Sequence, residues 1–512
     1  MESDKYYLKV AHARDLKGTD RFIFRLFEIL PGALTWTTFA LVILLSIFKP
    51  VWAAIFIIAF DLYWLLKTVH LSFHHYYNWK RLKHNMSLDW QKMIAHLKYE
   101  HLYHMVILPY YTESLEVIEG SIKSLLSSKY KKSKMIIVLA SEMRAGDEAY
   151  EFAKLMQEKY SDEFGHFIIS RHPSDLPGEI KGKGPNITYA AEFARTEILD
   201  VHNIAYENVI VSAFDIDTVV GDQYFGCLTW HFVTHETPYN VSFQPIPLYN
   251  NNVWETPAIS RVAAMTSTFW QMIQQERPEK LVTFSSHSLS FKALYEVGYW
   301  QKNMISDDSR IFFNLFLLKD GDYGVVPLSY AVSMDANLAP TWFQTVKNIY
   351  KQHFRWMWGV ENIPYLLFGF MKNKKIPLKK KFEHTFVQLE GFWSNATNPL
   401  MILVLGWLPI LLGGSEFRDS VLSYNLPHIT QYLMTISLVG LILSVVVAAS
   451  LLPKRPKHLK ENKLMWIPLT LQWILVPITI IVFGSFPGIH AQTRLMLGKY
   501  VGEFWVTPKH RK

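Results

Sequence analysis

The chain has 512 residues, of which 50% are hydrophobic and 15% aromatic, and its formal net charge is +8. This length can hold a soluble domain and additional membrane segments, and the uneven spread of apolar residues excludes a protein built only of membrane spans. The single cysteine, Cys227, excludes an internal disulfide and a cysteine-based zinc site. Basic clusters such as residues 454–457 lie beside apolar runs, which indicates cytoplasmic membrane flanks and argues against nucleic acid as a partner.

The first part of the chain predicts a membrane hairpin. Residues 1–32 are charged and amphipathic and lack the apolar core of a signal peptide, so we expect a cytoplasmic N-terminal segment. Apolar stretches over residues 33–48 and 51–71 are separated by Pro50, and each approaches the ~20 residues that cross a bilayer. The excess of Lys and Arg at residues 80–83 places the following domain on the cytoplasmic side.

An acidic residue interrupts the second apolar stretch. Asp61 lies within it, and an ionisable group at that depth is expected to face a partner or the membrane interface.

Beyond the hairpin, the pattern alternates between strands and helices up to residue 335. Strands are expected at residues 105–108, 135–139, 167–169 and 208–211, and helices at residues 114–127, 146–160 and 185–194. Such β-α-β alternation predicts an α/β domain with a mostly parallel sheet that helices cover on both faces.

Three further apolar blocks follow, over residues 399–412, 430–452 and 465–483. The basic loop at residues 453–463 is expected on the cytoplasmic side. Three crossings would leave the C-terminus outside, although the tail is basic. Either Pro477 breaks the last block into a re-entrant hairpin or one block does not cross, and the sequence leaves both alternatives open.

The acidic pair Asp215 and Asp217 follows the expected strand at residues 208–211 directly. The pair therefore lies at the carboxyl end of a buried strand, where open α/β sheets bind ligands. Alternation along an extended segment puts both side chains on the same side. There they could hold a hard divalent cation that also bridges a diphosphate. For so short a motif, a solvated acidic turn is the alternative.

Two loops could bind a nucleotide. The segment at residues 108–113 ends the first strand and could close over a base and ribose, and a strand-ending proline turn is the alternative. The segment at residues 178–186 combines glycines, lysines and a following helix N-terminus, which suits phosphate binding. A flexible surface loop is the alternative there.

Two helices carry further candidates. Residues 305–310 lead into a helix, where Asp308 could act as a general base toward an acceptor hydroxyl; helix capping is the alternative. Gln352, Arg355 and Trp356 share one helix face. The indole could stack on a sugar ring and the guanidinium could offset diphosphate charge, and an aromatic interfacial helix is the alternative.

The order and spacing of these motifs resemble the inverting, metal-dependent glycosyltransferases of family 2, which have a GT-A fold. The resemblance is closest to the membrane-embedded branch with cellulose, chitin and hyaluronan synthases, in which D-x-D, T-E-D and Q-x-x-R-W follow one another. The corresponding segments here are Asp215-Ile216-Asp217, Ser306-Asp307-Asp308 and Gln352-His353-Phe354-Arg355-Trp356. Lys181 and Asn186 stand where the family has K-A-G-x-x-N, and residues 504–509 resemble the F-x-V-T-x-K gating loop.

The resemblance implies an α/β GT-A (Rossmann-like) catalytic domain flanked by transmembrane α-helices, with Mg²⁺ or Mn²⁺ as cofactor. It implies catalysis by Asp308, acceptor and diphosphate binding by Gln352, Arg355 and Trp356, and metal binding by Asp217 and Asp215. Donor binding would fall to Pro109, Tyr110, Glu113, Glu142, Lys181, Asn186 and Asp215, and gating to Phe504, Val506, Thr507 and Lys509. Glu142 is the only residue of Ala140-Ser141-Glu142 that could replace the acidic pair usual after the second strand.

These expectations divide the chain into six parts. They are an N-terminal segment (1–32), a transmembrane hairpin (33–71), the catalytic domain (72–335), interfacial helices (336–395), transmembrane helices (396–485) and a C-terminal tail (486–512). The expected location is the plasma (inner) membrane, with the catalytic domain in the cytoplasm.

The expected reaction transfers a sugar from a nucleotide-diphosphate sugar to a growing glycan. Repeated transfer to the same glycan would make it a processive polysaccharide synthesis. A membrane lipid acceptor is the alternative, and membrane lipids are expected partners in either case. A third hypothesis is a membrane protein that binds the nucleotide sugar without turnover. The Glu142 substitution supports it, whereas the complete set of Asp215, Asp217, Asp308 and Arg355 argues against it.

Overall fold

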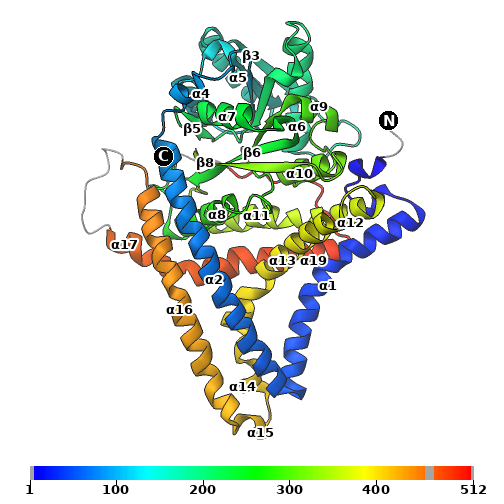
Figure 1. The fold of residues 1–512 in the computed structure, drawn as a ribbon, viewed down its shortest axis with the longest axis vertical. Helices are drawn as coiled ribbons and strands as arrows, with labels where there is room; N and C mark the ends of the chain where they lie inside the picture. Colours follow the sequence, from blue (N-terminus) through cyan, green and yellow to red (C-terminus); the bar gives the residue numbers. More distant parts are fainter. Residues whose placement is uncertain (1–4, 456–465, 509–512) are drawn as a thin grey trace.

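The computed structural model describes residues 5–455 and 466–508. Figure 1 shows an α/β part at one end of the long axis and a group of long helices that descends toward the other end. Between them, α8 (Ala258–Gln275) and α11 (Trp342–Met357) lie across the molecule beneath the sheet. The α/β part and the descending helices therefore form two layers, with a tier of crosswise helices at their junction.

One eight-stranded sheet organises the α/β part, in the order β3-β2-β1-β4-β7-β6-β8-β5. The strands are β1 (Tyr103–Pro109), β2 (Met135–Glu142), β3 (His166–His172), β4 (Val209–Ala213), β5 (Val219–Val220), β6 (Val241–Tyr249), β7 (Ser288–Ser290) and β8 (Gly324–Met334). The four strands expected from the sequence are present and run parallel to one another. Beyond β4 the sheet becomes mixed, because β7 pairs antiparallel with both β4 and β6.

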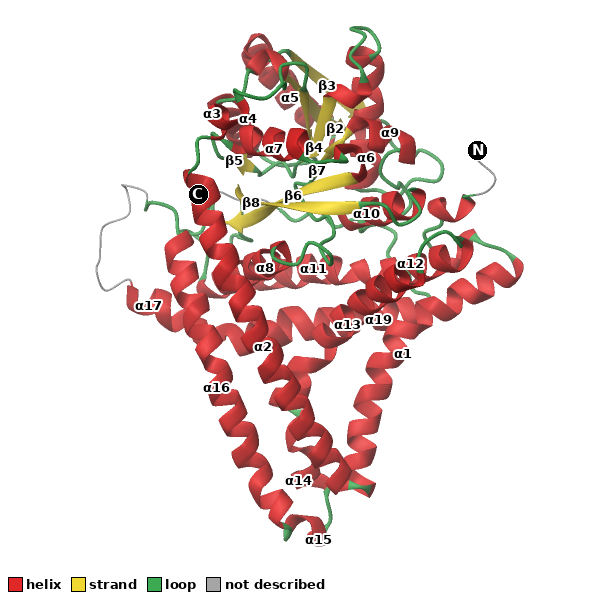
Figure 2. Ribbon diagram, in the orientation of Figure 1, coloured by secondary structure: helices red, strands yellow, loops and turns green. Residues whose placement is uncertain are grey.

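The two faces of the sheet are buried in separate apolar clusters. Along β1, Ile107 belongs to one cluster and Val106 to the other, as the alternation of a strand requires. Each such side chain contributes about 1.5–3 kcal/mol when it is fully buried. The covering helices are α4 (Leu115–Ser127), α5 (Asp147–Tyr160), α6 (Lys183–Ala194), α7 (Tyr224–Thr234), α9 (Phe291–Val297) and α10 (Asp307–Leu318) (Figure 2).

Four helical segments in the described residues are long and apolar enough to cross a membrane: Gly18–Phe48 (α1), Pro50–Ser87 (α2), Val421–Leu451 (α16) and Trp466–Met496. A bent pair, Leu378–Leu403 (α13) with Leu405–Leu412, is a fifth candidate, and its bend is 50°. The helices α1 and α2 extend well beyond the predicted apolar stretches. As a result, the predicted domain boundaries near residues 32, 71 and 395 lie inside continuous helices.

The last apolar block takes a different course from the others. It contains α17 (Trp466–Leu471) and α18 (Val476–Ile480) and continues into α19 (Phe486–Met496). Figure 1 shows this part of the chain level across the molecule while α2 and α16 descend. Pro477 and Pro487 are the second residues of α18 and α19, and a π-helical turn separates the two helices. The helix breaks near Pro477, and both alternatives for this block, a re-entrant hairpin or a block that does not cross, stay predictions.

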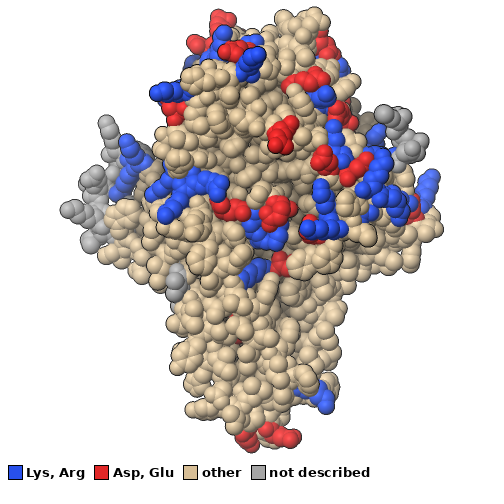
Figure 3. Space-filling model, viewed as in Figure 1, with Lys and Arg blue, Asp and Glu red and all other residues tan. Residues whose placement is uncertain are grey.

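The two layers differ in their surface charge and in the polar contacts of their helices. Figure 3 shows Lys, Arg, Asp and Glu over the α/β part and the junction, whereas the lower part of this face is almost uncharged down to its tip. Within it, Asp61 is buried and accepts a hydrogen bond from Thr430 of α16 at 2.8 Å, so it faces a partner helix as expected. Higher up, Asn78 and Asn85 of α2 donate to Ser329 and to the Leu328 carbonyl of β8.

A close contact between α1 and α19 depends on Gly32. A Cβ atom there would lie 2.7 Å from the Met496 Cβ and 2.8 Å from the Gln492 carbonyl oxygen. We expect Gly32→Ala to push α1 away from α19 and to lower the unfolding free energy by about 1–3 kcal/mol. Thermal unfolding of the detergent-purified protein measures this loss.

The matched control is Gly391→Ala in α13, where an added Cβ meets nothing within 4 Å. This control should be neutral or should stabilise the helix by up to about 1 kcal/mol. Equal melting temperatures for the two variants would contradict the contact at Gly32.

Candidate active site

The site lies where several segments end at one edge of the sheet. Asp215 and Asp217 follow β4, the segment at residues 285–287 precedes β7, and Asp307 and Asp308 begin α10. In a parallel arrangement the carboxyl end of a strand and the following helix N-terminus meet at the same edge. These acids, far apart in the sequence, therefore come together there.

Lys183, the first residue of α6, is at the centre of the site. Its ammonium group donates to Asp215 Oδ1 at 2.7 Å and to Asp308 Oδ1 at 2.9 Å. The side chain is only 8% exposed. Burial by itself lowers the pKa of Lys183, but the charges of Asp215 and Asp308 raise it by more than burial lowers it. The net shift of the pKa is therefore upward, and the ammonium stays charged.

The two acids of the D-x-D segment are held differently. Asp215 accepts a second hydrogen bond from the Ser285 hydroxyl at 2.7 Å. Asp217 is fully buried, and its Oδ2 accepts from the backbone N–H of Asp335 at 2.8 Å. The Asn251 amide donates to the Asp217 carbonyl and to Asp335 Oδ1, both at 2.9 Å. Asp217 is thus fixed by the residue that follows β8, whereas the Asp215 side chain remains 28% exposed.

His287 lies beside Asp308, and its hydrogen bonds define its protonation state. Its Nδ1 is 2.9 Å from the Phe284 carbonyl, and its Nε2 is 3.3 Å from the Trp300 indole nitrogen. A carbonyl only accepts and an indole N–H only donates, so the imidazole is neutral and carries its proton on Nδ1. Burial agrees with this state, because it lowers the pKa of His287 despite the opposing effect of Asp308.

The two acids that begin α10 have distinct environments. Asp307 is buried against α6, where a Cβ on Gly184 would lie 3.3 Å from the Asp307 Cβ. Burial, together with the charge of Asp308, raises the pKa of Asp307, which favours its protonated form. Asp308 is 26% exposed and makes the bond to Lys183.

A second group of side chains comes from α11. Trp356 packs beside the Tyr249 ring, with 6.2 Å between the ring centroids, and beside the His353 ring at 4.7 Å. A small pocket is lined by Tyr249, Ser260, Ala263, Ala264, Ala336, Asn337, Ile349, Gln352, His353 and Trp356. Burial raises the pKa of Tyr249, and the charges of Asp215, Asp217 and Asp308 raise it further while Arg355 opposes them. Tyr249 therefore lies between the acids and the α11 side chains.

The C-terminal tail covers the same region. The Phe504 backbone N–H donates to the Lys181 carbonyl at 2.9 Å, and Glu503 forms a β-bridge with Lys181. The Arg355 guanidinium lies 4.1 Å from the centroid of the Phe504 ring. A Cβ on Gly182 would lie 2.8 Å from the Phe504 Cβ, so only glycine allows this approach. The tail therefore contacts both the glycine-rich segment and α11.

A comparison with known families identifies the chain. Residues 210–483, more than half of the chain, match the family described as "Glycosyl transferase family group 2". The chain belongs to this family. The matched region begins in β4 and includes Asp215, Asp217, Asp308 and Arg355. Sugar transfer from a nucleotide sugar is the reaction class of the family, and the expected α/β GT-A class of the catalytic domain is confirmed.

Solved structures offer more distant likenesses. The mannosyltransferase PcManGT from Pyrobaculum calidifontis, in complex with GDP-Man and Mn²⁺, is 13% identical, with 77% of this chain and 99% of that chain covered and a TM-score of 0.43. S. aureus TarS 1–349, in complex with UDP-GlcNAc, is 12% identical, with coverages of 68% and 91% and a TM-score of 0.34. No match was found among curated proteins. The assignment therefore depends on the family match alone.

Some predicted donor-binding residues of this glycosyltransferase have contacts away from Lys183. The Lys181 side chain is 53% exposed, with its ammonium 3.9 Å from Asp175, so its backbone and not its charge contacts the tail. Asn186 is buried and donates to the Ala140 carbonyl at 3.0 Å, which joins α6 to the end of β2. Glu142 forms an ion pair with Arg144.

The segment after β1 is also turned inward. Pro109 ends the strand, and the buried Tyr110 donates its hydroxyl to the Ala149 carbonyl at 2.6 Å. Glu113 accepts from the Tyr111 backbone N–H at 2.7 Å. These contacts stabilise the turn that follows β1.

In the tail, Thr507 is buried and Val506 is half-buried, whereas Lys509 lies outside the described residues. The sequence-based prediction missed Lys183, Tyr249, Ser285 and His287. Only Lys183 had a signal, since Gly182-Lys183-Gly184 lies in the predicted phosphate-binding segment.

The two lysines of this segment allow a matched test. Lys183→Met leaves Asp215 and Asp308 facing each other without their counter-ion. Because both carboxylates are partly exposed, we expect a loss of about 1–3 kcal/mol in unfolding free energy. The exposed Lys181→Met should change stability by less than about 0.5 kcal/mol. Urea unfolding followed by tryptophan fluorescence compares the two, and a larger effect of Lys181→Met would refute the central position of Lys183.

Proposed function

We propose that this glycosyltransferase is membrane-bound, inverts the anomeric configuration, and transfers a sugar from a nucleotide-diphosphate sugar to a hydroxyl acceptor beside the bilayer. The observation that carries the proposal is the convergence of Asp215 and Asp308 on the Lys183 ammonium, at 2.7 and 2.9 Å. A catalytic base and a cation-binding acid at one pocket are what a metal-dependent inverting transfer requires.

The donor would bind along the glycine-rich segment and the N-terminus of α6, where backbone N–H groups and Lys183 favour phosphate. Asp217 and Asp215 would hold Mg²⁺ or Mn²⁺. In the described residues, no group of three or more His, Cys, Asp or Glu side chains could hold a metal ion. Two carboxylates nevertheless fit these hard cations, which take their remaining ligands from substrate phosphates and water. When bound, the cation would supply charge neutralisation for the leaving diphosphate.

Asp308 is the proposed base. Its carboxylate takes the proton of the acceptor hydroxyl as that oxygen bonds to the anomeric carbon. The bond from this carbon to the diphosphate oxygen breaks on the opposite face, so the configuration inverts in one step. Arg355 offsets charge on the departing diphosphate, and Gln352, Trp356 and Tyr249 position the acceptor sugar. The raised pKa of Asp307 disfavours a second negative charge beside the base.

The membrane arrangement follows from the helices and the chain ends. If α1, α2, the bent α13 pair and α16 cross, the number of crossings is even and both ends lie on the side of the catalytic domain. Contacts of the ends support this, because Lys5 donates to the Leu318 carbonyl at 2.6 Å and Phe504 pairs with Lys181. The basic flanks support a cytoplasmic location for this side, and the surrounding lipid would be that of the plasma membrane.

The acceptor is proposed to be a growing glycan. A membrane lipid is the second candidate, and it is favoured by the small number of spanning candidates, four or at most five in the described residues. The product distinguishes the two acceptors. A single-sugar glycolipid extracts into organic solvent, whereas an extended glycan is water-soluble and shortens under glycosidase digestion.

The base is tested by Asp308→Asn. We expect transfer from the active donor in a panel of radiolabelled nucleotide sugars to fall about 10²–10⁴-fold, because an amide cannot accept the proton. Donor binding, measured by filter retention, should persist. Asp307→Asn is the matched comparison: the amide resembles the protonated acid, so its loss of transfer should be much smaller. Equal losses in both variants would argue against Asp308 as the base.

The cation is tested by chelation and by Asp217→Ala. Excess EDTA should abolish transfer by the wild-type protein, and added Mn²⁺ or Mg²⁺ should restore it. Asp217→Ala should weaken the Mn²⁺-dependent part of donor binding at least about tenfold, since one of two carboxylate ligands is lost. Wild-type activity that persists in the chelator would contradict the proposed metal.

A further inference from the structure

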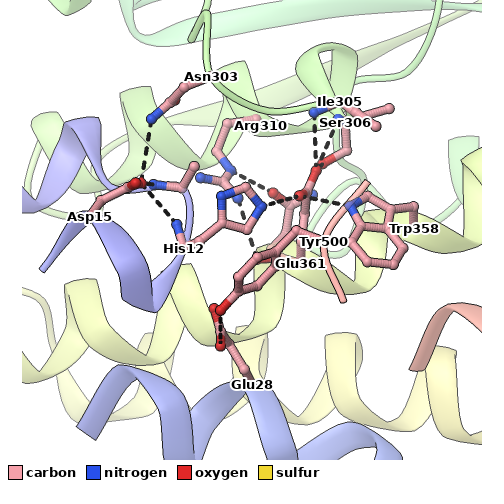
Figure 4. Close-up of polar contacts among 12 residues, drawn as sticks. His12, Asp15, Glu28, Asn303, Ile305, Ser306, Arg310, Trp358, Glu361 and Tyr500 are labelled. Atoms are coloured by element: carbon pink, nitrogen blue, oxygen red, sulfur yellow. Dashed lines mark hydrogen bonds and ion pairs between the residues drawn. The ribbon is translucent and has the colours of Figure 1, made fainter. Parts of the chain in front are cut away.

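A buried polar network lies outside the proposed active site and has Glu361 at its centre. Figure 4 shows the Glu361 carboxylate surrounded by side chains and backbone groups from the N-terminal segment, the start of α10, and the C-terminal tail. Glu361 is 1% exposed. A buried carboxylate is unfavourable unless its hydrogen bonds are well satisfied, so the groups around it indicate what it does.

Glu361 accepts hydrogen bonds from the loop that precedes the acid pair. Its Oε1 accepts from the backbone N–H of Ile305 at 3.3 Å, and from the N–H and hydroxyl of Ser306 at 3.1 and 2.9 Å. Its Oε2 accepts from the Trp358 indole at 2.9 Å. The residue immediately before Asp307 is thereby held at both its backbone and its side chain.

A second tether lies beyond the acids. Arg310, fully buried in the first turns of α10, donates to Asn362 Oδ1 at 2.6 Å and to the Glu361 carbonyl at 3.3 Å. Asp307 and Asp308 therefore lie between two points of attachment, Ser306 and Arg310, and both points are fixed to residues 361 and 362. These contacts on both sides of the acid pair fix the orientation and position of the first turn of α10.

The same junction continues from α11. The 3-10 turn Trp358–Glu361 follows directly on the helix that carries Gln352 and Arg355. A displacement of Glu361 would therefore change the position of Asp308 relative to Arg355. Pre-organised geometry of this kind matters because misplacement of a reacting group by about 1 Å can cost on the order of 10²-fold in rate.

The N-terminal segment closes the network. The Val10 carbonyl accepts from Arg310 at 3.2 Å, and His12 Nε2 lies 3.7 Å from Glu361 Oε2. The His12 ring packs on Tyr500, with ring centroids 4.2 Å apart, and the Tyr500 hydroxyl donates to Glu28 at 2.7 Å (Figure 4). The start of the tail thus attaches to the support that holds the acid pair.

We propose that Glu361 is a positioning residue that fixes Asp308 against the α11 side chains, an inference that rests on the proposed function. Glu361 touches neither donor nor acceptor in this assignment and acts through Ser306 and the first turn of α10. Its removal should therefore change the rate of transfer and leave donor binding intact.

The test is Glu361→Gln in the full-length protein, assayed with the radiolabelled nucleotide sugar that the wild type uses and with Mn²⁺. The amide nitrogen cannot accept from Trp358 or Ser306, so one side of the support is lost. We expect kcat to fall about 10–100-fold and the donor KM to stay within about twofold. The matched control is Glu276→Gln. Glu276 is also a largely buried acid, but its side-chain partners, Asn78 and Arg81, are on α2. The kcat of this variant should stay unchanged.

A milder variant keeps the test decisive if Glu361→Gln does not fold. Trp358→Phe removes only the indole N–H and should lower kcat about threefold to tenfold at unchanged KM. Combined with Glu361→Gln it should add little, because both act on one contact. Glu361→Asp, which keeps the charge, should recover part of the rate.

The outcomes separate the two proposals. Wild-type kcat in Glu361→Gln, or a raised donor KM at unchanged kcat, would overturn the positioning role and leave the proposed function standing. A wild-type protein that transfers no sugar from any donor would remove the proposed function, and the positioning role with it.

Discussion

The site depends on a single buried ammonium group. Two neighbouring carboxylates repel each other, and the Lys183 ammonium between Asp215 and Asp308 replaces that repulsion with two short ion pairs. Through these bonds the start of α6, the segment after β4 and the start of α10 are fixed relative to one another. Under the proposed function, a donor diphosphate would compete with Asp215 and Asp308 for the same ammonium. The ion pairs and the proposed donor binding would then be alternatives for one positive charge.

Burial determines which of the neighbouring groups add to this balance. His287 lies 3.8 Å from Asp308, yet its two hydrogen bonds fix it as a neutral imidazole. Burial raises the pKa of Asp307, which favours its neutral form. The charged contacts at Lys183 are therefore its ion pairs with Asp215 and Asp308.

Much of this arrangement could be predicted from the sequence, for physical reasons that differ between elements. The strands β1, β2 and β4 are apolar runs buried on both faces, and such runs are visible in one dimension. The β7 strand, Ser288–Ser290, is short and polar, and β6 contains Pro245 and Pro247, so neither has a strand periodicity to detect. The helices α1 and α2 were predicted too short because their polar ends continue past the apolar stretches.

The site residues divide in the same way. The acids Asp215, Asp217 and Asp308 stand in motifs whose spacing is informative. Lys183 was missed in favour of Lys181 because both lie in one glycine-rich run, and only the direction of each side chain separates them. Glu361 has no motif at all. Its importance comes from contacts with residues more than 50 positions away, such as Ser306, which a one-dimensional pattern does not record.

The continuous helix α2 joins the apolar helical part of the molecule to the sheet. It runs from Pro50 to Ser87 without a break, and its upper end is attached to β8 through Asn78 and Asn85. At about 1.5 Å per residue, the 16 residues beyond position 71 (72–87) rise about 24 Å. If the apolar part of α2 crosses a bilayer, as the proposed function has it, this stretch of helix joins the bilayer to the sheet without a hinge. The sheet could then not turn or move independently of the spanning helices.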